Sequence, residues 1–152
     1  MPEQDVEPKG QLKRLRIGRR SAILLAWFFV VVWAGVIFAF SATPHLRVAE
    51  AADLDFILRK AGHMAAFGIL AVLLWRALTL SAVGHAIAWS LMLTIAYAAS
   101  DEFHQSFTAG RNASPVDVGI DSAGALIALL ALVVWLYVRA GRAARIGRPG
   151  PD

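Results

Sequence analysis

The sequence predicts an all-α polytopic membrane protein with four transmembrane helices and both termini on the cytoplasmic side. Two observations lead to this prediction. Hydrophobic residues make up 58% of the 152 residues, with a mean hydropathy of +0.58. These residues are also gathered in four long runs. A soluble domain of this size has too little interior to bury so much apolar surface.

The first two runs differ in how cleanly they are bounded. The run 22–40 contains 19 residues without a charge, which is long enough to cross a hydrocarbon core of about 30 Å. Its length exceeds the roughly 7–15 residues of a signal-peptide core, so a membrane helix is favoured over a cleaved signal peptide. The second run spans about 56–80, but only 61–75 is uncharged. The basic residues at its two ends are therefore expected near the membrane surfaces, where long side chains reach water.

The third and fourth runs each carry an ionisable residue near the start. The third covers about 82–99 and is interrupted only by His85. The fourth covers 118–138 and contains Asp121. Both are long enough to span a bilayer as helices.

The distribution of basic residues sets the expected orientation. With the N-terminus inside, the inner segments 1–21, 76–84 and 139–152 hold 11 of the 15 Lys and Arg residues. Cytoplasmic segments carry such an excess, which predicts an N-in and C-in topology. We therefore expect a cytoplasmic basic segment over 1–21, a membrane domain over 22–138 and a cytoplasmic basic tail over 139–152. Since the basic residues flank the membrane domain, they indicate contact with anionic lipid and no nucleic-acid partner.

This topology places polar residues of three helices on the same outer surface. The second helix begins there, the third ends there and the fourth begins there again. Ionisable residues are expensive inside a bilayer, so a cluster of them marks a candidate functional site. The residues concerned are Lys60, His63, Asp101, Glu102, His104, Gln105, Asp117 and Asp121.

Helical spacing orients these side chains. Lys60, His63 and Phe67 fall on one face of the second helix. On the third helix, Tyr97 and Asp101 share a face with His104 and Gln105, which directs Asp101 toward the bundle. The alternative interpretation treats Asp101 and Glu102 as a solvated helix end.

The start of the fourth helix raises a question of charge balance. Ser114 followed by Pro115 is typical of a helix N-cap and first position. Asp117 and Asp121 then lie one turn apart and repel each other unless a partner is near. We expect that partner to be Arg111, Lys60, a protonated histidine or a cation. Farther along, small residues allow close approach of a neighbouring helix, namely Gly124, Ala125 and Ala128.

The polar segments carry a resemblance to a known family. The run from Ser100 to Arg111, followed by Ser114, Asp117 and Gly124, resembles the signature of VanZ-like membrane proteins. Lys60, His63 and Phe67 match the second-span pattern of that family, Ser41 and Pro44 resemble its first outer loop, and the likeness covers about residues 22–138. The family commonly has Asn where this chain has Asp121, which makes this site more acidic.

The resemblance implies a multi-pass protein of the bacterial cytoplasmic membrane. Its namesake is associated with low-level resistance to teicoplanin, but the resemblance supplies no reaction. We favour a protein that binds a lipid-linked, cell-wall or glycopeptide ligand at its outer face. A membrane enzyme acting on a lipid-linked substrate is the alternative, and a small transporter is less favoured.

Each function assigns roles to the same residues. In an enzyme, the candidate catalytic residues are His63, Asp101, Glu102 and His104, with His63 or His104 as general acid or base and Asp101 orienting it. The candidate ligand-binding residues are Lys60, Gln105, Arg111, Asp117 and Asp121, because Arg and Lys suit anionic groups. Carboxylates with histidine also suit a divalent metal, although no spacing matches a known metal motif. The sequence identifies no cofactor and does not define the oligomeric state.

The chain contains no cysteine. Disulfides, thiolate metal sites and cysteine nucleophiles are therefore excluded.

Overall fold

The computed structural model describes residues 8–43, 51–108 and 114–146, and its only regular elements within these are helices joined by turns. The four helices are α1 (Pro8–Ser41), α2 (Ala52–Leu80), α3 (Ala86–Gln105) and α4 (Pro115–Ile146). The prediction of an all-α protein with four helices is confirmed. Each helix carries one of the four apolar runs, although α3 begins four residues into its run, and α1 and α4 extend well into the basic flanks.

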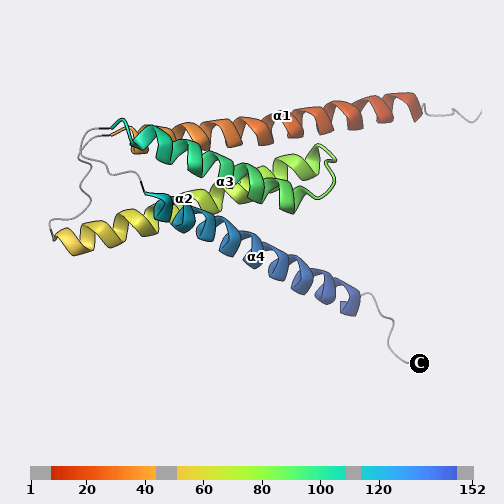
Figure 1. Ribbon diagram of the computed structural model, residues 1–152. Helices are drawn as coiled ribbons and strands as arrows, with labels where there is room; N and C mark the ends of the chain where they lie inside the picture. Colours follow the sequence, from red (N-terminus) through yellow and green to blue (C-terminus); the bar gives the residue numbers. More distant parts are fainter. Residues whose placement is uncertain (1–7, 44–50, 109–113, 147–152) are drawn as a thin grey trace, which may run out of the picture.

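Consecutive helices run in opposite directions, so the start of α1 and the end of α4 lie toward the same end of the molecule (Figure 1). The central helix is α2, which contacts each of the other three and packs most extensively on α4. Within the described residues α1 and α4 do not touch. The opposite end of the molecule brings together the ends of α1 and α3 with the start of α4 (Figure 1).

The helices bury polar residues together with an apolar core, and they expose many large apolar side chains. On α3 the buried face carries Ser90, Thr94 and Asp101, whereas Met92 and Ile95 are exposed. Ser90 and Thr94 donate their hydroxyl hydrogens to carbonyl oxygens of α3 itself, over 2.8 and 2.7 Å. An apolar exterior that encloses hydrogen-bonded polar groups suits a lipid solvent, because lipid solvates no backbone or polar group.

Three helical segments in the described part of the chain are long and apolar enough to cross a membrane: Gly18–Ser41, Asp53–Leu80 and Pro115–Ala143. Helix α3 is not among them, because its last turns carry Asp101 and Glu102. Its 20 residues nevertheless rise about 30 Å, the thickness of a hydrocarbon core.

Two glycines set the distance between α2 and α4. A Cβ atom on Gly124 would lie 2.2 Å from the carbonyl oxygen of Met64, and one on Gly68 would lie 3.1 Å from the carbonyl oxygen of Gly124. The backbones of the two helices therefore meet at this crossing, as small residues permit in membrane helix pairs. The predicted role of Gly124 in close helix approach is confirmed.

Side-chain hydrogen bonds fix α1 against its two neighbours. The indole nitrogen of Trp33 donates to the carbonyl oxygen of Ala66 on α2 over 2.9 Å. The hydroxyl of Tyr97 on α3 donates to the carbonyl oxygen of Ala34 over 2.7 Å. Since lipid offers no competing partner, these bonds hold α1 in a defined position above α2 and α3.

Candidate functional site

One end of the bundle contains most of the buried ionisable residues, and we call it the polar end. It consists of the last turns of α1 and α3, the first turns of α4 and the part of α2 from Asp55 to Phe67 (Figure 1). Its buried polar side chains are Ser41, Asp55, Asp101, Glu102, Gln105 and Asp121. The structure thus brings together residues that the sequence placed on three helices, and adds the end of α1.

Asp101 is the centre of a network that joins α1 to α3. Its Oδ2 atom accepts a hydrogen bond from Ser41 Oγ at 2.7 Å and another from Gln105 Nε2 at 2.8 Å. The side chain of Asp101 points into the bundle, as its helical spacing predicted, and only 3% of the residue is exposed. Its Oδ1 atom is buried and accepts no hydrogen bond from any residue that the structure describes.

Glu102 connects α3 to the start of α4. Its Oε1 atom accepts a hydrogen bond from the backbone N–H of Ser114, whose own hydroxyl accepts one from Val116 at 3.2 Å. Ser114 is therefore the N-cap of α4, as predicted. Glu102 lies beyond the apolar run that ends at Ala99, and burial raises its pKa, although the Ser114 N–H acts to lower it.

One salt bridge and one histidine–aspartate contact bridge α2 and α4. Lys60 Nζ forms a salt bridge with Asp117 Oδ1, and His63 Nδ1 lies 3.5 Å from Asp121 Oδ2. The pairs form because the close crossing at Gly124 sets one face of each helix opposite the other. Both aspartates thus have the partners that their mutual repulsion required, a lysine and a histidine.

The remaining predicted site residues lie apart from these pairs. His104 packs its ring on Phe38, with the ring centroids 4.5 Å apart, whereas Asp101 is bonded to Ser41 and Gln105. The structure therefore does not pair Asp101 with His104. Arg111 lies outside the residues that the structure describes.

Two members of the polar end were not among the predicted site residues, although Ser41 belongs to the family resemblance. Ser41 is completely buried against Asp101, and Asp55 pairs with Arg59, its Oδ2 lying 3.0 Å from Arg59 Nε. A single serine after an apolar run has no periodicity that marks it as buried. The i, i+4 spacing of Asp55 and Arg59 was a usable signal for their ion pair.

The polar end contains more acids than permanent cations. Its described acids are Asp55, Asp101, Glu102, Asp117 and Asp121, while Arg59 and Lys60 are its only described lysine or arginine residues. The remaining acids are neutralised by protons or by ligand groups, since unpaired charge at this depth is unfavourable. Within residues 8–43, 51–108 and 114–146, no three His, Asp or Glu side chains are grouped so that they could hold a metal ion.

The chemistry available at the polar end is recognition by hydrogen bonds and charges, together with one histidine held by a buried carboxylate. Taken with the apolar exterior, these features define a helical membrane protein with a preformed polar site at one end.

A family model described as VanZ/LLP1 matches residues 22–137, and the chain belongs to this family. The match covers the apolar part of all four helices. No curated protein and no solved structure matches the chain.

Proposed function

We propose that this VanZ-like protein lies in the bacterial cytoplasmic membrane and binds a cell-envelope ligand at its polar end, which faces outward. The ligand is a lipid-linked precursor, a cell-wall component or a glycopeptide of the teicoplanin type. The observation that supports the proposal is the burial of Asp101 and Asp121 among apolar helices. Membrane proteins keep such costly groups where they serve a site.

The orientation follows from charge and from helix direction. In this proposal the chain crosses the membrane four times, with 1–21 and 139–152 in the cytoplasm. Most Lys and Arg residues lie in those segments. Because the start of α1 and the end of α4 lie at the end of the bundle opposite the polar end, the polar end faces outward (Figure 1).

The topology is testable because the chain has no cysteine of its own. We expect Thr43→Cys and Ser106→Cys to react with a membrane-impermeant maleimide in intact cells, since both residues are exposed near the polar end. Gly84→Cys and Gly141→Cys, also exposed, are expected to react only after the cells are permeabilised. The reverse pattern would place the polar end in the cytoplasm and contradict the proposal.

Ligand binding is testable with a matched pair of carboxylate variants. Asp101→Asn keeps the shape of the side chain but removes its charge, and we expect about a tenfold loss of affinity because bonds to charged groups are worth about 1.5–3 kcal/mol. Asp53→Asn removes an exposed carboxylate from the first turn of α2 and should change nothing. The measurement is titration of the purified full chain with teicoplanin and with a lipid-linked cell-wall precursor. Absence of binding of either ligand to the unaltered protein would refute the function.

A second candidate function is an enzyme that acts on a lipid-linked substrate. The observation that favours it is the His63–Asp121 pair, because a buried carboxylate beside one ring nitrogen orients a histidine as a general base. Turnover of a lipid pyrophosphate by the unaltered protein, together with its loss in His63→Gln, would favour the enzyme over the binding protein.

A further inference from the structure

A cavity of about 320 Å³ lies between α1 and α2, beside the polar end. Its walls are mainly hydrocarbon, contributed by Val36, Ile37 and Phe40 on α1 and by Leu58 on α2. Its volume falls at the lower end of the range of small-molecule sites, about 300–1,000 Å³. Since an unfilled apolar cavity forfeits dispersion contacts along its walls, a hydrocarbon occupant would be stabilising.

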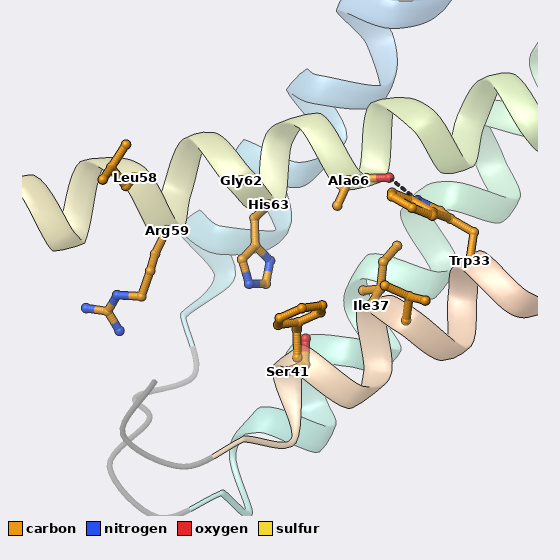
Figure 2. Close-up of a pocket in the computed structure, with 10 residues that line it drawn as sticks. Trp33, Ile37, Ser41, Leu58, Arg59, Gly62, His63 and Ala66 are labelled. Atoms are coloured by element: carbon orange, nitrogen blue, oxygen red, sulfur yellow. Dashed lines mark hydrogen bonds between the residues drawn. The ribbon is translucent and has the colours of Figure 1, made fainter. Parts of the chain in front are cut away.

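The cavity changes from apolar to polar along its length. The hydrogen bond from Trp33 to Ala66 lies toward one end, and the side chains of Arg59 and His63 extend from α2 toward the other (Figure 2). Ser41, at the end of α1, also lines the cavity. A bilayer lipid has the same direction of polarity, with its headgroup at the membrane surface and its chain directed inward.

Arg59 and His63 each keep nitrogen atoms that are not directed at their aspartate partners. Arg59 directs Nε toward Asp55 and His63 directs Nδ1 toward Asp121; within the described residues the two Nη groups of Arg59 and Nε2 of His63 have no partner. Each aspartate thus lies against one nitrogen of its partner side chain and leaves the other nitrogens uncovered. A guanidinium group with two available nitrogens matches the oxygens of a phosphate.

We infer that the cavity binds one anionic lipid, with its hydrocarbon chain between α1 and α2 and its phosphate at Arg59 and His63. The inference rests on the proposed function and specifies the chemical class of one ligand. A chain alone would satisfy the apolar walls, whereas Arg59 and His63 select for the phosphate.

Two glycines provide a matched test of the chain-binding part. Gly62 lines the cavity, and a Cβ atom added there meets no atom within 4 Å, so Gly62→Leu fills the space without a backbone clash. Gly119 on α4 has the same open surroundings but lies outside the cavity, which makes Gly119→Leu the control. With hexadecyl phosphate as the probe, native mass spectrometry of the purified full chain should show at least a tenfold weaker adduct for Gly62→Leu only.

Headgroup selection is tested with probes that share one hydrocarbon chain and differ in the headgroup. The unaltered protein should bind hexadecyl phosphate at least tenfold more tightly than hexadecanol, and inorganic phosphate should bind weakly. Arg59→Gln should remove most of this preference, whereas Arg76→Gln, at the far end of α2, should retain it. Equal binding of the phosphate and the alcohol, or unchanged binding in Gly62→Leu, would overturn the inference.

The experiments distinguish a failure of the lipid site from a failure of the proposed function. If Gly62→Leu leaves hexadecyl phosphate binding unchanged while Asp101→Asn still weakens binding of the envelope ligand, the lipid site is wrong and the proposed function stands. If no envelope ligand binds but hexadecyl phosphate does so selectively, the cavity remains a lipid site and the proposed function is wrong.

Discussion

Replacing Gly124 with alanine is expected to destabilise the protein by about 1–3 kcal/mol, the range for overpacked helix contacts. The added Cβ would lie 2.2 Å from the carbonyl oxygen of Met64 and 2.7 Å from its Cα. Both are backbone atoms of α2, so no side chain can move aside and the helices must separate. Alanine favours a helix over glycine by about 1 kcal/mol, which offsets only part of this cost. Thermal unfolding of the detergent-solubilised chain measures the difference.

The control lies on the same helix. A Cβ atom on Gly119 meets no atom within 4 Å, so Gly119→Ala should retain stability or increase it slightly. Gly68→Ala should fall between the two, because its Cβ would lie 3.1 Å from the carbonyl oxygen of Gly124 and 3.2 Å from the Cβ of Ala128. Equal melting temperatures for Gly124→Ala and Gly119→Ala would show that the crossing is not tightly packed.

The number and approximate position of the helices could be predicted from the sequence, because apolar runs and membrane thickness determine them. The ends of the helices were harder to predict from the sequence. The predicted third run, 82–99, corresponds to a helix at Ala86–Gln105, which continues through Asp101 and Glu102. The helix does not end at these acids because both are buried and bonded to neighbouring helices.

The sequence predicted which residues belong to the candidate site better than it predicted which of them contact each other. Helical spacing placed Asp101 and Gln105 together on an inward face of the third helix, and both are buried. Spacing within one helix does not specify its rotation against another. It therefore left open whether Lys60, Arg111, a protonated histidine or a cation would lie beside Asp117 and Asp121. The crossing at Gly124 decides this, by placing His63 opposite Asp121.

The His63–Asp121 and Lys60–Asp117 pairs should differ strongly in energy, although they bridge the same two helices. The side chain of Asp121 is 3% exposed, so His63→Leu leaves a buried carboxylate without its partner. Removing one member of a buried pair costs about 3–5 kcal/mol. We expect the lower end of this range, because His63 is partly exposed and lies 3.5 Å away. The free energy of unfolding in detergent is the measurement.

Lys60→Leu serves as the comparison. The side chains of Lys60 and Asp117 are 27% and 22% exposed, so water can solvate Asp117 after the lysine is removed, and the loss should be about 1 kcal/mol or less. Adding Asp121→Leu to His63→Leu should recover most of the lost stability, because no buried charge then remains. If His63→Leu and Lys60→Leu prove equally mild, Asp121 does not depend on His63, and the histidine is free to serve a ligand alone.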